Sequence, residues 1–159
     1  MSGELSPSAQ KVQEALRAQE IDCRVVELPS SARSAQEAAQ AIGCQVEQII
    51  KSLVFQGQLT QKPVLILASG ANRVDEKKIG ALVSEPIEKA NADFVRKRTG
   101  FAIGGVPPVA HTEAMETLID EDLLQYREVW AAAGTPHAVF KLDPGDLKRI
   151  TGGRVVSIK

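Results

Sequence analysis

The sequence predicts an α/β protein of the α+β type, in which a mixed, mostly antiparallel sheet is flanked by helices. The 159 residues suit a single domain, residues 1–159, and 43% of them are hydrophobic, which is enough for a buried core. Strand-like and helix-like segments follow one another without strict alternation, which favours a mixed sheet. We find no internal repeat, linker or low-complexity segment.

The first half of the chain predicts two helices and three strands. Residues 8–19 place apolar side chains at helical spacing behind a Ser-Pro start. Ser34 and Glu37 form a capping box that opens an alanine-rich helix, and Gly43 ends it. Apolar or β-rich runs predict strands at 23–28, 49–55 and 63–69, with a helical turn at 46–48.

The second half predicts three further helices and four strands. Helices at 74–83 and 91–98 are separated by the helix-breaking residues 84–86. Asp143 as N-cap and Pro144 at the first helical position begin a last short helix. We expect strands near 115–120, 127–133 and 137–142, and an edge strand at 154–158.

The composition excludes several classes of function. A net charge of −1 argues against broad electrostatic coating of nucleic acid, so such a partner requires a local basic patch. No apolar run approaches the ~20 residues that span a bilayer, and no secretory signal begins the chain, so we expect a cytoplasmic protein without a membrane partner. Cys23 and Cys44 stand alone, and we expect two buried thiols, no metal and no cofactor.

The segment TGFAIGGVPPVAH, residues 99–111, joins a glycine pair to a proline pair. Gly104 and Gly105 can bring bare backbone against a small ligand, while Pro107 and Pro108 keep the loop from collapsing. A rigid loop that presents one or two amides suits an acyl carbonyl and the oxyanion it becomes. The alternative is a tight turn that joins a helix to a strand.

Lys51 interrupts the apolar strand predicted at 49–55. Lysine is almost never fully buried unless it is paired. Its ammonium group could lie at the mouth of a pocket and hold a carbonyl or phosphate oxygen. An outward-facing or snorkelling lysine on a half-exposed strand explains the pattern equally well.

Further candidates lie near these segments. His111 and His137 are the only histidines, and either could act as a general base, although a structural or surface role is also compatible with each. Ser69 and Asp75 flank a loop that follows an apolar strand, and such loops often carry ligand contacts. Asp75 could instead offset a helix dipole. The basic residues 96–98 form a solvated face or a docking place for a polyanion.

Together these residues resemble the YbaK-like family of aminoacyl-tRNA deacylases, which is related to the editing domain of bacterial prolyl-tRNA synthetases (ProX-type proteins). The resemblance covers most of the chain, including SAQEAAQAIGCQVEQIIKSLVF, LILASGANRVDEKKI and TGFAIGGVPPVAH. The two hallmarks of the family are a strand lysine and a glycine-x-x-x-proline loop. They map onto Lys51 and onto Gly104 through Pro108.

The resemblance implies a trans-editing hydrolase that removes a misattached amino acid from the aminoacyl-tRNA acceptor end, its expected partner. It implies no side-chain nucleophile, and the terminal ribose hydroxyl assists the water. Lys51 would fix the substrate, Gly104 and Gly105 would contact its carbonyl or oxyanion, and Pro108 would shape the loop. The residues expected to bind substrate are Leu28, Ser69, Gly70, Asn72, Asp75, Ile103, Val106, His111 and His137.

Three positions depart from family members that act on cysteinyl-tRNA. Leu28 and Val139 replace their tyrosine and aspartate, and His111 replaces a neutral polar residue. We therefore expect a small residue such as alanine, serine or threonine on the tRNA, and the sequence does not choose among them. The alternatives are a non-catalytic module that binds aminoacylated tRNA ends or a synthetase, and a small-ester hydrolase unrelated to tRNA.

Overall fold

The computed structural model describes residues 5–30, 32 and 34–159. The helices are α1 (Pro7–Ala18), α2 (Ala35–Ile42), α3 (Glu76–Val83), α4 (Ala92–Thr99) and α5 (Pro144–Thr151), with 3₁₀ turns η1 (Val46–Gln48) and η2 (Glu121–Gln125). The strands are β1 (Val25–Glu27), β2 (Ile50–Gly57), β3 (Pro63–Ser69), β4 (Ile87–Lys89), β5 (Glu116–Asp120), β6 (Val129–Ala132), β7 (Ala138–Leu142) and β8 (Arg154–Val156).

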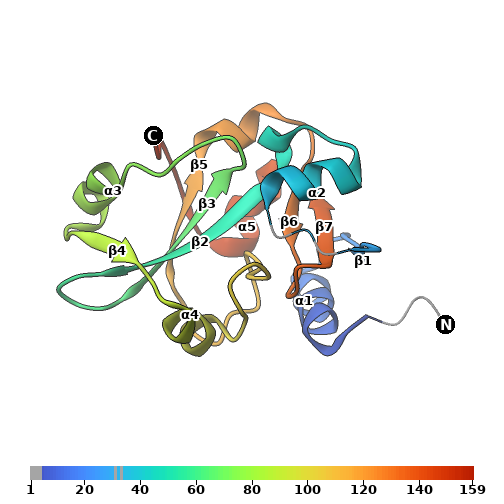
Figure 1. The fold of residues 1–159 in the computed structure, drawn as a ribbon, viewed down its shortest axis with the longest axis horizontal. Helices are drawn as coiled ribbons and strands as arrows, with labels where there is room; N and C mark the ends of the chain where they lie inside the picture. Colours follow the sequence, from blue (N-terminus) through green and yellow to red (C-terminus); the bar gives the residue numbers. More distant parts are fainter. Residues whose placement is uncertain (1–4, 31, 33) are drawn as a thin grey trace.

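These strands form two sheets, where the sequence predicted a single mixed one (Figure 1). One has the order β1-β7-β6 and is antiparallel, and the other has the order β4-β2-β3-β5-β8. In the larger sheet β2 pairs antiparallel with β3 and β4, while β5 is parallel to both β3 and β8. A parallel bridge between Ile49 and Trp130 links the sheets. Most pairings are therefore antiparallel, as expected.

Local sequence signals account for the helix ends. Ser34 and Glu37 form the predicted capping box, and Gly43 ends α2 in the left-handed conformation, with φ of 88°. The side chain of Asn91 accepts a hydrogen bond from the Phe94 N–H and caps α4, and Asp143 caps α5 in the same way. None of the helices in the described ranges is long and apolar enough to cross a membrane.

Strand β3 lies between two hydrophobic clusters, so every one of its residues is buried. Leu65 and Leu67 face a cluster formed with α1, α5 and the smaller sheet. Val64, Ile66 and Ala68 face a second cluster, which includes Ile79 of α3. Burial on both faces explains why this strand reads as a continuous apolar run. It also makes β3 a rigid support for its neighbour β2, which carries Lys51.

Candidate functional site

The candidate site lies where one edge of β2 is unpaired. Strand β4 pairs only with Phe55–Gly57, and the next hydrogen bond runs from the Ala90 N–H to the Val54 carbonyl. At the other end, the bridge of Ile49 to Trp130 begins the smaller sheet. Residues 50–53 therefore have no strand neighbour on this edge among the described residues. Two adjoining cavities, of about 670 and 490 Å³, lie along this gap.

The larger cavity has a wall of small apolar residues. Trp130 and Val139 also line it, so the residue that replaces the aspartate of the cysteine-specific relatives does face this space. The alanines of the wall are Ala32, Ala35, Ala38, Ala71, Ala131, Ala132 and Ala138. Gly70 lines the cavity too, and a Cβ there would lie 2.3 Å from the Val46 carbonyl oxygen, so only glycine lets η1 approach.

Lys51 lies at the wall that the two cavities share. Its side chain is half-buried, and its Nζ donates a 2.6 Å hydrogen bond to the Asn72 carbonyl. Burial lowers the pKa of the ammonium below its ordinary value, Arg73 lowers it further, and Asp120 opposes both effects. Among the described residues that line the larger cavity, Lys51 is the only ionisable one.

The glycine-proline loop faces Lys51 through Ile103, Gly104 and Val106. Gly104 has φ of 96°, a conformation that favours glycine. Within the described chain, neither the Gly104 nor the Val106 N–H has a protein acceptor. Val106 is only 3% exposed, so an unpaired amide there is costly unless a ligand or water accepts from it. The Ile103 N–H likewise has no acceptor among the described residues, so the amides of Ile103, Gly104 and Val106 are the candidate oxyanion donors of the residues that line the cavity.

Gly105 plays a different part from the one that the sequence suggested. Its N–H donates to the Ala102 carbonyl at 3.0 Å, and its carbonyl accepts from the Gly134 N–H at 2.9 Å. A Cβ at this position would lie 2.8 Å from the Thr135 Cα. Both backbone groups are thus used inside the protein. Gly105 docks the loop against the segment before β7, and its neighbours carry the free amides.

The smaller cavity has more charged side chains in its lining than the larger one. Arg73, Glu76 and Lys89 line it together with Lys51 and Val95 of α4. The basic residues 96–98 occupy the last turn of the same helix. The larger cavity and the smaller, more cationic cavity therefore adjoin at Lys51.

Pro108 and both histidines lie outside this pair of cavities. His111 is half-buried, its ring nitrogen Nε2 donates to the Pro107 carbonyl at 2.6 Å, and His111 and Pro108 line a separate cavity of about 270 Å³. Burial lowers the pKa of His111, and the Pro107 carbonyl opposes this only in part. His137 is exposed, and its carbonyl accepts the Leu28 N–H at 2.6 Å. Leu28 and His137 are thus paired through their backbones and line neither cavity at Lys51.

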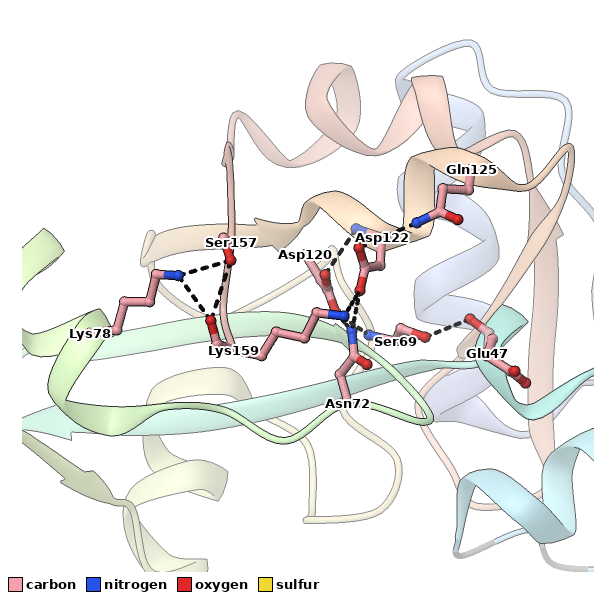
Figure 2. A network of polar contacts seen from close by, with 9 residues as sticks. All are labelled: Glu47, Ser69, Asn72, Lys78, Asp120, Asp122, Gln125, Ser157 and Lys159. Carbon is pink, nitrogen blue, oxygen red and sulfur yellow. Dashed lines mark hydrogen bonds and ion pairs between the residues drawn. The ribbon is translucent and has the colours of Figure 1, made fainter.

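Two of the predicted substrate contacts, Ser69 and Asn72, belong to a polar network that includes Asp120 (Figure 2). Ser69 donates its hydroxyl to the Glu47 carbonyl at 2.8 Å and its N–H to Asp120 at 2.9 Å. The Asn72 amide donates to Asp120 and Asp122 at 2.9 and 2.8 Å. Asp75 caps α3 and donates its N–H to the Ile158 carbonyl. None of the three lines the cavities at Lys51.

Sequence reasoning missed Asp120. A signal was available, because carboxyl ends of parallel strands meet at one edge of a sheet, and Asp120 ends β5 beside the end of β3.

The remaining titratable candidates are inert in this arrangement. Cys23 and Cys44 are free thiols in half-buried positions, and burial is the main cause that raises the pKa of each. The described residues contain no cluster of side chains that could hold a metal ion.

Comparison with known proteins shows the family of the chain. The model of the aminoacyl-tRNA editing domain matches residues 29–150. The chain belongs to this family. The expected fold class and enzyme class, an aminoacyl-tRNA deacylase, are thereby confirmed.

Individual relatives agree with the assignment. The chain is 51% identical to a proposed trans-editing enzyme for prolyl-tRNA synthetase of known structure, with a TM-score of 0.93 over 98% of this chain and 99% of the other. It is 30% identical to the uncharacterized protein YwhH of Bacillus subtilis, over 82% of this chain and 83% of that protein. It is 27% identical to EbsC of Enterococcus faecalis, a proposed Cys-tRNA(Pro)/Cys-tRNA(Cys) deacylase, over 79% and 76%.

Proposed function

We propose that this protein is a trans-editing hydrolase that removes a small misattached amino acid, namely alanine, serine or threonine, from tRNA. One observation carries the proposal: Lys51, Gly104 and Val106 line one cavity, the N–H groups of the last two have no protein acceptor, and the described residues of that cavity include no nucleophile–base pair. Positioning and oxyanion stabilisation can act on an ester that is already activated.

The larger cavity suits the aminoacyl group and the terminal ribose together. Its volume of about 670 Å³ falls within the usual range of ~300–1,000 Å³ for ligand sites. The apolar wall, with Val139 in it, offers nothing that pairs specifically with a thiol, which argues against a cysteinyl substrate. The adjoining cationic cavity, with Arg73 and Lys89, suits the phosphate of the acceptor end.

In the proposed reaction, water attacks the ester carbonyl while the Gly104 and Val106 N–H groups donate hydrogen bonds to the oxygen that becomes negatively charged. The Lys51 ammonium holds a substrate oxygen and cannot act as a base while protonated. The free hydroxyl of the terminal ribose orients the water. The bond between the carbonyl carbon and the esterified ribose oxygen then breaks, that ester oxygen takes a proton from the attacking water, and the products are the free amino acid and the deacylated tRNA. The site needs no cofactor for these steps.

The proposal is tested with purified protein and a panel of aminoacyl-tRNA(Pro) species that carry alanine, serine, threonine, cysteine or proline. We expect hydrolysis of one or more of the first three and little hydrolysis of the cysteinyl and prolyl esters. Lys51→Ala should lower the rate at least about 100-fold with an unchanged melting curve, because half-buried Lys51 bonds only the Asn72 carbonyl.

Two results would contradict this proposal. A protein that binds aminoacyl-tRNA tightly without turnover would be a recognition module, and a fully active Lys51→Ala variant would remove Lys51 from the site. The acceptor end is the proposed partner, and an aminoacyl-tRNA synthetase is a second candidate. Adding prolyl-tRNA synthetase to the assay shows whether deacylation depends on it. We propose a cytoplasmic location, where these substrates are made.

A further inference from the structure

We propose that Asp120 and Asn72 form a positioning unit that holds the Lys51 ammonium in place. Neither side chain lines the cavities, so both act through Lys51. This inference rests on the proposed function only for its kinetic test. Its structural test can be made without any substrate.

Lys51 contacts the loop that follows β3. The Lys51 Nζ has one hydrogen-bond partner among the described residues, the main-chain carbonyl of Asn72 at 2.6 Å. A lysine side chain has four rotatable bonds and loses considerable rotamer freedom when it is fixed. The position of this carbonyl therefore decides where the ammonium group lies relative to Gly104 and Val106.

Asn72 lies in a turn in which its own N–H donates to the Ser69 carbonyl at 2.9 Å. Its side-chain amide lies between two carboxylates, Asp120 at 2.9 Å and Asp122 at 2.8 Å (Figure 2). The residue is thus held at both ends, and the carbonyl between them has little freedom to turn.

Asp120 is only 1% exposed. Its carboxylate accepts three hydrogen bonds, from the Ser69 N–H, the Asn72 amide and the Asp122 N–H, each at 2.9 Å. A buried charge requires such compensation, and a group held by three donors from two strand ends cannot move independently. Asp120 therefore ties the end of β3 to the end of β5 directly behind Lys51.

Lys159 and Lys78 make further polar contacts on the solvent side of this unit. The Lys159 ammonium pairs with Asp122 at 2.8 Å, and its main-chain oxygen accepts from the Lys78 ammonium at 2.9 Å (Figure 2). Lys159 is exposed and Asp122 is partly exposed, so their ion pair contributes little by itself. We assign the positioning role to Asp120 and Asn72 because Asp120 is buried and Asn72 carries the carbonyl.

The decisive variant is Asn72→Ala, which keeps the carbonyl that binds Lys51 and removes the amide that fixes it. We expect single-turnover deacylation of the best substrate in the panel to fall about 10- to 100-fold, because displacements near 1 Å can cost ~100-fold. Asn91→Ala is the matched control: it removes the cap of α4, a comparable structural contact that does not touch Lys51. This control should retain the parent rate within about twofold.

A pH profile separates positioning from simple loss of stability. Asp120 raises the Lys51 pKa against the lowering by burial and Arg73, while Asp122 is already paired with Lys159. Asp120→Asn should therefore move the loss of activity at alkaline pH to a lower pH, because the ammonium deprotonates earlier. Asn91→Ala should leave this limb of the profile unchanged.

The structural readout is the exchange of the Lys51 ammonium protons with water, followed by NMR in the free protein. We expect faster exchange in Asn72→Ala and unchanged exchange in Asn91→Ala. Unchanged exchange and an unchanged rate in a folded Asn72→Ala variant would overturn the inference. If the parent hydrolyses no aminoacyl-tRNA, the proposed function fails, and the exchange measurement still decides whether Asn72 and Asp120 hold Lys51.

Discussion

Replacing Gly105 by alanine should displace the glycine-proline loop, because the new side chain clashes with the main chain against which the loop packs. The new Cβ would lie 2.8 Å from the Thr135 Cα and 2.9 Å from the Gly134 carbonyl carbon, where ordinary contacts begin at 3.4 Å. Both neighbours are main-chain atoms that cannot rotate away, so one loop must shift by roughly half an ångström, and the 2.9 Å bond from Gly134 to Gly105 weakens. We expect the free energy of unfolding to fall by about 1–3 kcal/mol.

The same shift should reduce activity, because it moves the Gly104 and Val106 amides on either side of Gly105. We expect alanyl-tRNA(Pro) deacylation at saturating enzyme to fall at least about 10-fold, since oxyanion donors work only at short range. Urea unfolding gives the stability, and release of labelled alanine gives the rate. Gly152→Ala is the control: it has φ of 68° and nothing within 4 Å of a new Cβ, so it carries backbone strain alone. It should lose about 1 kcal/mol and retain activity.

A Gly105→Ala variant that unfolds at the parent urea concentration and deacylates at the parent rate would refute the reasoning. The loop would then tolerate a side chain at its docking point, and the position of its amides would not depend on Gly134 and Thr135. An equal loss of activity in Gly152→Ala would also count against it, because the effect would then follow general destabilisation.

Other expected outcomes concern buried polar groups. Ser52→Ala should leave the free energy of unfolding unchanged or raise it by about 1 kcal/mol, because the buried Ser52 hydroxyl has no partner among the described residues; a clear loss in urea unfolding would show a hidden partner. Burial lowers the pKa of His111 below 6.5, so the unfolded state binds the proton more readily, and stability should fall as the pH drops from about 6.5 toward that lowered pKa. His111→Ala should abolish this part of the pH dependence of stability. Because His111 lies outside the Lys51 cavities, the same substitution should change the deacylation rate by less than about 10-fold. A larger loss, with a flattened acid limb in the pH–rate profile, would indicate that His111 is a general base. Cys23→Ser and Cys44→Ser should retain deacylation, and loss of turnover in a folded variant would indicate a thiol mechanism.

A helix or strand could be predicted from the sequence where its own residues form a recognisable pattern. Strand β3 is apolar throughout because both of its faces are buried, and α2 is bounded by a capping box and a left-handed glycine. Strand β4 gave no signal, because three residues after a helix breaker are too few to show a period. The division into two sheets was also beyond reach, since pairing partners depend on contacts between distant segments.

The candidate site shows the same limit. Lys51 and Gly104 could be singled out because each breaks the pattern around it. Spacing does not reveal where a backbone group points, so Gly105 looked equivalent to Gly104, although its amide is used inside the protein. Ser69 and Asn72 were near the site in sequence, but only the structure reveals that they face Asp120.

The unpaired stretch of β2 has a consequence for how the protein behaves in a crowded solution. An open strand edge can add a strand from another chain, which is a common route to self-association. Here the exposed Ile103 and the buried Val106 line the space beside residues 50–53 that an incoming strand would occupy. The glycine-proline loop thus covers the unpaired edge of β2, and the same loop helps to form the candidate site there. A substitution that loosens this loop should make the protein self-associate as well as lose activity. Light scattering would detect the self-association, and the deacylation assay would detect the loss of activity.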